Sequence, residues 1–225
     1  MSKTVFISGI DTDAGKSIVT GLMALSLKEK GVNVITQKFV QTGNTTSSED
    51  IEQHREIMGV KPYSVDTDRT TCPLIFTYPC SPHLAAEIDK TSIDVNLITD
   101  ATKKLESKFE KVLLEGAGGL YVPISREYYT IDYVQEHDLP LILVTSSKLG
   151  SINHTLMSLE LCKNRGINVV GLVYNEFPND SEQILNDSAS VFQHYLDENY
   201  PDCKIVNVPI IKDDKWPVID FSSIL

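Results

Sequence analysis

The sequence predicts an α/β fold with a doubly wound, mainly parallel sheet and helices on both of its faces. Short, almost continuous runs of Val, Ile and Leu alternate with longer segments whose apolar residues recur at helical spacing. Strands covered on both faces lose the apolar–polar alternation of half-exposed strands, so continuous apolar runs are typical of a parallel sheet between helical layers. The repeated strand–helix order indicates one domain over residues 1–225.

Each expected strand is a short apolar run bounded by polar or turn-forming residues. The expected strands span residues 4–8, 33–39, 111–115, 141–145, 169–174 and 204–208. The expected helices lie between them and span residues 16–30, 49–58, 95–109, 131–136, 152–164 and 181–199. Two of these helices have a typical ending, because a glycine follows the basic residues Lys30 and Arg165.

The composition and net charge of the chain indicate which binding partners it is not expected to have. The chain has 225 residues, of which 41% are hydrophobic and 23% charged, as in ordinary globular proteins rather than disordered ones. Asp and Glu number 31 against 20 Lys and Arg, which gives a formal charge of −11. Such an acidic chain lacks the broad basic surface that nucleic acid or an anionic membrane requires, so neither is an expected partner.

The sequence also bears on the compartment. Residues 1–10 lack the pattern of a secretory leader, and no apolar run approaches the ~20 residues that span a bilayer. The 4 cysteines lie far apart without CxxC spacing, which is typical of free thiols in a reducing compartment rather than of a zinc site. We therefore expect a cytoplasmic protein.

The loop after the first strand is the clearest chemical signal. Residues 9–17 are Gly-Ile-Asp-Thr-Asp-Ala-Gly-Lys-Ser, and a helical pattern follows at once. In P-loop NTPases such a loop binds phosphate through main-chain N–H groups, its lysine reaches the β- and γ-phosphates, and its hydroxyl ligates Mg²⁺. We expect these roles for Lys16 and Ser17, although the glycines lie one residue further apart than usual. A tight turn without a ligand is the alternative.

Two more strand ends place charged residues at the same edge of the predicted sheet. Lys38 lies near the end of strand 33–39, and Glu115 ends strand 111–115 before Gly-Ala-Gly-Gly. Ligands of doubly wound sheets bind at the carboxyl ends of the strands, so both side chains are expected beside the phosphate loop. A carboxylate there is a suitable second ligand for Mg²⁺. A lysine at the sheet edge and a carboxylate facing water are the plain alternatives.

Several separated segments resemble those of the dethiobiotin synthetases, in the same order and at similar spacing. The loop 9–17 resembles the family's G-T-D-T-E-V-G-K-T loop, and residues 115–119 equal its E-G-A-G-G segment. Lys38 and Thr42 match the lysine and hydroxyl of a K-P-V-x-S/T-G segment, with Phe39 in place of the proline. The run 148–154 is similar to a K-L-G-x-I-N-H segment. The resemblance covers residues 3–211, whereas residues 212–225 match poorly.

The resemblance implies an ATP-dependent ligase of biotin biosynthesis. The family joins 7,8-diaminononanoate (7,8-diaminopelargonate) to CO₂, drawn from bicarbonate, and forms dethiobiotin, ADP and phosphate through an N-carbamate and a carbamic–phosphoric anhydride. It also implies Mg²⁺ as cofactor, ATP as co-substrate and a homodimer. A nucleotide-switch or partitioning ATPase of the same fold is the alternative of a different class. Those proteins have a second lysine early in the loop, where this chain has Asp11.

The resemblance also implies roles for individual residues. Lys38, Lys16 and Thr12 are expected to be catalytic, and the expected metal ligands are Ser17, Asp50 and Glu115. The residues expected to bind the nucleotide are Asp13, Ala14, Gly15, Lys16, Ser17, Ile18, Asp50, Glu115, Gly116, Ala117, Gly118, Asn175, Glu176, Pro209, Ile210 and Ile211. The residues expected to bind the substrate are Thr12, Lys38, Thr42, Gly150, Ser151, Ile152 and Asn153.

Some of these positions have an ordinary structural interpretation as well. Asp50 is alternatively a carboxylate that caps or opens a helix, with Glu49 as the fallback ligand. Asn175 is expected to pair its amide with the edge of adenine, although asparagine also suits a turn at a strand end. Residues 81–83, Ser-Pro-His, resemble another family segment, for which we expect a structural role or a position near the substrate.

Overall fold

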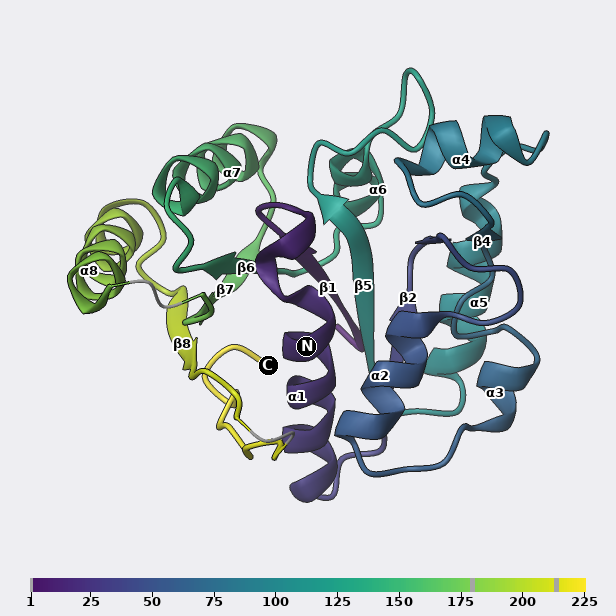
Figure 1. Ribbon diagram of the computed structural model, residues 1–225, viewed down its shortest axis with the longest axis horizontal. Helices are drawn as coiled ribbons and strands as arrows, with labels where there is room; N and C mark the ends of the chain where they lie inside the picture. Colours follow the sequence, from purple (N-terminus) through teal and green to yellow (C-terminus); the bar gives the residue numbers. More distant parts are fainter. Residues whose placement is uncertain (1, 179–180, 213–214) are drawn as a thin grey trace.

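The predicted apolar runs form one parallel sheet in the computed structural model, which describes residues 2–178, 181–212 and 215–225 (Figure 1). The sheet has 6 strands in the order β2-β5-β1-β6-β7-β8, and every neighbouring pair is parallel. The strands are β1 Thr4–Gly9, β2 Val34–Lys38, β5 Lys111–Gly119, β6 Leu141–Ser146, β7 Val169–Asn175 and β8 Lys204–Val208. The expected α/β fold is therefore confirmed.

The longer helices also form where the apolar periodicity predicts them. They are α1 Lys16–Glu29, α2 Glu49–Ile57, α5 Val95–Glu106, α6 Thr130–Glu136, α7 Ser151–Arg165 and α8 Glu182–Asn199. The sequence does not predict the shorter elements, which are the 3₁₀ turn η1 Thr12–Ala14, strands β3 Gln41–Thr42 and β4 Ile75–Phe76, and helices α3 Ser64–Thr67 and α4 Pro82–Ile88. All but α4 are too short for a periodic pattern to develop, whereas α4, with 7 residues, is as long as the predicted α6 and was missed.

Alternation within the strands sorts apolar side chains onto the two faces of the sheet. Phe6 and Leu114 lie in a buried cluster with residues of α4 to α8, whereas their neighbours Ile7 and Leu113 lie in a second cluster with residues of α1 and α2. Both faces are therefore covered, which explains why the strands are apolar along their whole length. None of the helices among the described residues is long and apolar enough to cross a membrane.

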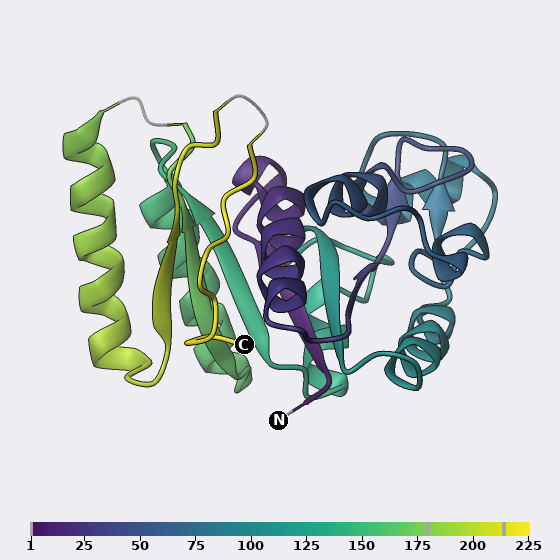
Figure 2. The same cartoon turned by 90° about the horizontal axis from the view of Figure 1, so that it is seen from below.

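The segment 215–225 shares a face of the sheet with α1. Figure 2 shows it running beside α1, and Phe221 and Ile224 are buried in the same apolar cluster as that helix. A Cβ atom on Gly171 of β7 would lie 2.6 Å from Ile224, so the glycine leaves room for this side chain. Although its sequence matches the family poorly, this segment forms part of the core.

Strand β5 differs from its prediction at one end. The sequence suggests that the strand ends at Glu115, but it continues through the glycines to Gly119. Gly9 pairs with Gly119 after a shift in register between Ile7 and Gly9. The glycine segment is therefore held against the start of the phosphate loop as an extension of the sheet.

Candidate active site

The phosphate loop (residues 9–17) connects β1 to α1 at the carboxyl edge of the sheet. Gly15 has φ +88°, a left-handed conformation that favours glycine, and it precedes the first residue of α1. A Cβ atom at Gly15 would also lie 2.3 Å from Nδ2 of Asn175. Both the backbone angle and the close neighbour therefore require glycine here, and the free N–H groups at the start of α1 suit an anion.

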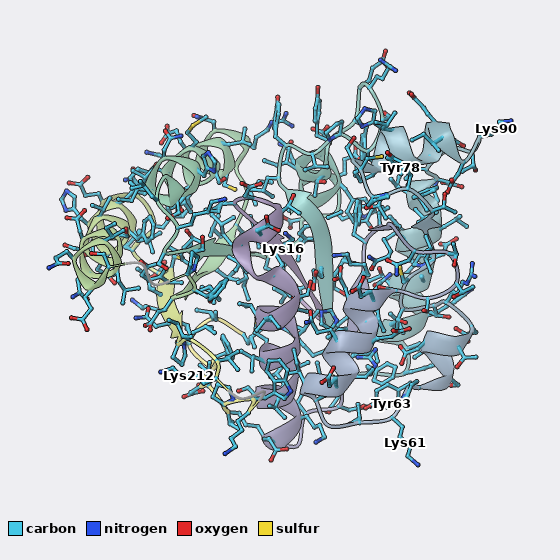
Figure 3. The ribbon with its side chains drawn as sticks, in the orientation of Figure 1. Lys16, Lys61, Tyr63, Tyr78, Lys90 and Lys212 are labelled. Atoms are coloured by element: carbon cyan, nitrogen blue, oxygen red, sulfur yellow. The ribbon has the colours of Figure 1, made fainter. Side chains whose placement is uncertain are left out.

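Lys16 turns back over the phosphate loop (Figure 3). Its Nζ donates to the main-chain oxygens of Asp11 at 3.0 Å and Thr12 at 3.2 Å, and only 5% of the residue is exposed. Burial lowers the pKa of Lys16 to about 8, and the nearby Lys38 contributes to this lowering. The ammonium therefore lacks a full counter-charge, which a bound triphosphate would provide.

The expected metal ligands lie together. Ser17 Oγ lies 2.9 Å from Oδ1 of Asp50 and 2.9 Å from Oε1 of Glu115. Lys38 Nζ donates to the same Oε1 at 2.7 Å and to the main-chain oxygen of Gly116 at 3.1 Å, and it forms an ion pair with Asp50. The structure therefore places Ser17, Lys38, Asp50 and Glu115 in one contiguous cluster.

Asp50 lies in the first turn of α2 but does not cap it. Ser48 caps α2, since its hydroxyl accepts from the N–H of Ile51, and Glu49 is exposed. The carboxylate of Asp50 instead faces Ser17 and Lys38. Asp50 is therefore not the helix cap, and Glu49 is not placed to substitute for it.

Opposite charges stabilise one another in this cluster. Burial alone would raise the pKa of Glu115, but the charge of Lys38 and the hydrogen bonds from His54 and Lys38 outweigh it and hold the pKa well below the usual carboxyl range. Burial alone would lower the pKa of Lys38, but Glu115 and Asp50 outweigh it and raise that pKa above its ordinary value. Both groups are consequently charged near neutral pH.

The cluster fits Mg²⁺ by its chemistry. Its donors are a hydroxyl and two carboxylates, and Mg²⁺ prefers such oxygen ligands, completed by water and phosphate oxygens. Among the described residues there is no group of three or more His, Cys, Asp or Glu placed to hold a metal by themselves.

A cavity of about 440 Å³, here called the nucleotide cavity, extends from the phosphate loop to an apolar end. Its lining consists of Thr12, Asp13, Gly15, Lys16, Ser17, Ile18, Gln53, Asn175, Phe177, Pro209, Ile211 and Trp216. Sequence reasoning missed Gln53, Phe177 and Trp216. The only available signal was that Trp216 is the 1 tryptophan of the chain. The residues that were expected to bind the nucleotide but are not part of this lining are Ala14, Asp50, Glu115, Gly116, Ala117, Gly118, Glu176 and Ile210.

Asn175 contacts the phosphate loop directly. Its Nδ2 donates to the main-chain oxygen of Ala14 at 3.2 Å, and its Oδ1 accepts from the N–H of Phe177 at 3.2 Å. The amide therefore joins β7 to the loop, which is a structural role that the sequence did not indicate. One N–H of the amide is left for a further partner.

A second cavity of about 510 Å³ lies on the other side of Thr12. It is lined by Ile10, Asp11, Thr12, Gly119, Leu120, Tyr121, Val122, His154, Met157, Ser158 and Leu161. The start of α7 lies beside it, where Gly150 and Ser151 join Asp11 and Asp13 around a smaller cavity. Ser151 Oγ is buried there without a hydrogen-bond partner among the described residues.

The remaining expected substrate residues are more scattered. Thr42 lies in β3, paired with Phe76, and it lines none of the cavities described above. Ile152 and Asn153 follow Ser151 in α7 but are absent from the lining of these cavities. Gly118 is closer to the loop, since a Cβ atom on it would lie 3.8 Å from Oγ1 of Thr12.

Known proteins resemble this chain over most of its length. A family model described as an AAA domain matches residues 3–207. The ATP-dependent dethiobiotin synthetase BioD 2 of Haemophilus influenzae is 53% identical over 178 residues, which are 79% of this chain and 93% of that protein. The chain belongs to the dethiobiotin synthetase family. It is therefore an enzyme of an ATP-dependent class, as the sequence motifs predicted.

Further dethiobiotin synthetases agree with this family. BioD 2 of Haemophilus ducreyi is 46% identical over 206 residues, which are 92% of this chain and 98% of that protein. BioD of Chlorobaculum tepidum is 48% identical over 185 residues, or 82% of this chain and 77% of that protein. The family model itself spans the predicted motifs from the phosphate loop to Asn175.

Solved structures confirm the P-loop fold. A ParA family ATPase from Chlorobium tepidum superposes with a TM-score of 0.54 at 19% identity, covering 95% of this chain and 86% of that one. Chloroplast FtsY from Physcomitrella patens gives a TM-score of 0.51 at 14% identity and covers 92% and 58%. Identity this low shows the shared fold alone, so the resemblance to a ParA ATPase does not support the alternative function.

Proposed function

We propose that this dethiobiotin synthetase joins 7,8-diaminononanoate to CO₂ with the use of ATP and releases dethiobiotin, ADP and phosphate. One observation supports this most strongly. Two buried lysines, Lys16 and Lys38, lie beside the oxygen cluster of Ser17, Asp50 and Glu115, and Lys38 is near enough to lower the pKa of Lys16. Two fixed cations suit a reaction in which a phosphoryl group passes between two anionic oxygens.

The proposed reaction balances in three steps. An amine of the substrate adds to CO₂ and loses a proton, which gives a carbamate. A carbamate oxygen then attacks the γ-phosphorus of ATP, and ADP leaves, so that a carbamic–phosphoric anhydride forms. Finally the second amine attacks the carbonyl carbon of the anhydride and loses a proton, and phosphate leaves as the cyclic urea closes. Little acid–base chemistry is required of the protein, because positioning and charge stabilisation dominate phosphoryl transfer.

The position of each side chain determines its proposed role in this reaction. Lys16 and the main-chain N–H groups at the start of α1 bind the triphosphate, and Lys38 holds the carbamate from the end of β2, on the far side of β5. Ser17, Asp50 and Glu115 hold Mg²⁺, which when bound neutralises the phosphate oxygens. Thr12 and Asp13 line the space between nucleotide and substrate, and Asp13 provides a counter-charge for the diamine.

The second cavity is the proposed site of the substrate chain. Its lining includes Leu120, Val122, Met157 and Leu161, which suit an alkyl chain, and Thr12 separates it from the nucleotide cavity. The free N–H groups at the start of α7 suit the substrate's carboxylate.

Exposed apolar side chains gather around this region, and we place the contact surface of a homodimer there. They are Tyr121 at 55%, Leu149 at 81% and Met157 at 64%.

An ADP-release assay tests the proposal. The complete mixture contains ATP, Mg²⁺, 7,8-diaminononanoate and bicarbonate, and each component is omitted in turn. We expect ADP release only when all are present, with dethiobiotin in equal amount. ADP release that does not depend on the diamine would instead favour the nucleotide-switch class.

A further inference from the structure

His54 contacts the metal-binding cluster but has no role in the proposed function. It lies on α2, one turn after Asp50, and its side chain is fully buried. Its Nε2 lies 2.8 Å from Oε2 of Glu115, and its Nδ1 lies 3.0 Å from Oγ1 of Thr36. His54 is therefore the partner of the Glu115 oxygen that faces away from Ser17 and Lys38.

The direction of each hydrogen bond follows from the two ends of the chain. The carboxylate of Glu115 is charged and can only accept, so the ring hydrogen of His54 is on Nε2, which donates to Oε2. Arg55 can only donate, and its Nη1 lies 2.8 Å from Oγ1 of Thr36, so this hydroxyl accepts from Arg55. The hydrogen of Thr36 is then available to Nδ1 of His54. Arg55, Thr36, His54 and Glu115 thus form one directed chain of hydrogen bonds.

The far end of this chain is firmly held. Arg55 forms a two-pronged pair with Asp66, with Nε to Oδ2 at 2.9 Å and Nη2 to Oδ1 at 2.9 Å. Asp66 also accepts from the hydroxyl of Thr71 and from the N–H of Tyr63. The ring of Tyr63, at the edge of the molecule in Figure 3, lies 5.1 Å from the guanidinium of Arg55. A bidentate pair with these supports has little rotational freedom.

We propose that His54 is a positioning residue that holds Oε2 of Glu115, so that only Oε1 is available to the metal. This inference rests on the proposed function, because it assumes that Glu115 ligates Mg²⁺. Mg²⁺ requires nearly octahedral geometry with single carboxylate oxygens, whereas Ca²⁺ accepts both oxygens of one carboxylate. A fixed Oε2 therefore favours the smaller ion. Partners of this kind commonly affect metal affinity although they do not touch the metal.

The test measures metal-dependent binding rather than turnover. The affinity for a non-hydrolysable ATP analogue is measured by calorimetry with Mg²⁺, with Ca²⁺ and with a chelator. In His54→Leu we expect the gain in affinity from Mg²⁺ to fall by about tenfold, while the affinity in chelator stays close to that of the wild type. We also expect the preference for Mg²⁺ over Ca²⁺ to decrease. His54→Gln keeps an N–H donor and should restore part of the gain.

Two further variants separate positioning from folding. Thr102→Val removes a different buried hydroxyl, which donates to Gln37 on the same strand as Thr36, and should leave the Mg²⁺ gain unchanged. If His54→Leu does not fold, Thr36→Val breaks the contact to Nδ1 and should reduce the gain in the same direction. The proposal is overturned if Mg²⁺ raises the affinity of the His54 or Thr36 variants for the analogue as much as it does for the wild type. It is also overturned if their affinity falls equally in the presence of chelator. Because binding is measured, failure of the proposed reaction would not imitate either result.

Discussion

Lys38 and Ser17 contact the same oxygen of Glu115. The ammonium lies 2.7 Å from Oε1 and the hydroxyl 2.9 Å from it, so a metal bound to this oxygen must share it or displace one of them. Both Lys38 and Glu115 are almost wholly buried. A buried charge without its partner is strongly destabilising, so Lys38 serves the stability of the free protein as well as the proposed reaction.

The first prediction concerns Lys38→Gln. We expect the variant to bind ATP but to lose ADP release, because the carbamate loses its cation. In the absence of metal its free energy of unfolding should fall by about 3 kcal/mol, because two carboxylates lose their buried partner. Its unfolding temperature should fall accordingly. Mg²⁺ should raise its unfolding temperature more than that of the wild type. Thermal unfolding with and without Mg²⁺ measures this.

Lys28→Gln is the matched control, because Lys28 is an exposed lysine on α1 whose ion pair with Glu29 is also exposed. It should change neither turnover nor the response to Mg²⁺. Turnover of Lys38→Gln within about threefold of the wild-type rate would contradict the role given to Lys38.

The second prediction is a pH dependence. With a pKa of about 8, Lys16 is charged below that pH and neutral above it in the free protein. A bound triphosphate stabilises the charged form, so affinity for ATP without metal should weaken by up to about tenfold per pH unit above 8. The pH dependence of folding stability has the opposite sign to that of ATP affinity. Burial of the charged lysine costs free energy, and this cost is relieved as the pH rises through about 8.

Calorimetric titrations with ATP and a chelator across this range measure the effect. Lys16→Arg keeps its charge at every pH in the range, so its affinity should be lower but nearly independent of pH. A wild-type affinity that is constant from neutral pH to well above 8 would count against a lowered pKa of Lys16.

The third prediction compares two glycines. Gly15→Ala should weaken nucleotide binding strongly, because its methyl group would lie 2.3 Å from Nδ2 of Asn175 and displace this amide, which contacts the phosphate loop. Gly31→Ala introduces a similar backbone strain at φ +80°, but nothing lies within 4 Å of its added methyl group. Both variants should lose about 1 kcal/mol of stability from the backbone strain, and Gly15→Ala more. Only Gly15→Ala should weaken ATP binding, and equal binding losses in both would contradict this account.

The fourth prediction uses the 1 tryptophan of the chain. Trp216 lines the apolar end of the nucleotide cavity, so ATP should change its fluorescence, and Trp216→Phe should abolish the signal without abolishing binding. Phe177→Ala should weaken the affinity for ATP by about tenfold if the base stacks on this ring. Tyr78, an aromatic residue that is 54% exposed beside α4, gives a control in Tyr78→Ala. Saturating ATP without any fluorescence change would place the base elsewhere.

The features that could be predicted from the sequence are those that depend on residues close together in the chain. The phosphate loop, the strands and the charged strand ends were all predicted, because a loop after a strand and a residue at its carboxyl end are fixed by short stretches of sequence. The direction of Asp50 was not, since a first-turn carboxylate and a metal ligand have the same sequence. Only the packing of α2 against α1 places it opposite Ser17.

The missed residues depend on contacts between distant segments. His54 and Glu115 lie 61 positions apart, and nothing near either residue in the sequence indicates that they meet. Trp216 follows the last strand in a segment without periodicity, so neither its burial nor its cavity could be derived. Asn175 was expected to bind the base, whereas its contact with the loop depends on where β7 lies relative to η1.

The segment that follows β8 links two parts of the molecule. Phe221 and Ile224 lie in the apolar layer beside α1, and Trp216 of the same segment lines the nucleotide cavity. The free energy that couples two sites acts equally in both directions. We therefore expect a ligand that binds against Trp216 to stabilise the packing of Phe221 and Ile224, and a substitution at either of those two positions to weaken nucleotide binding.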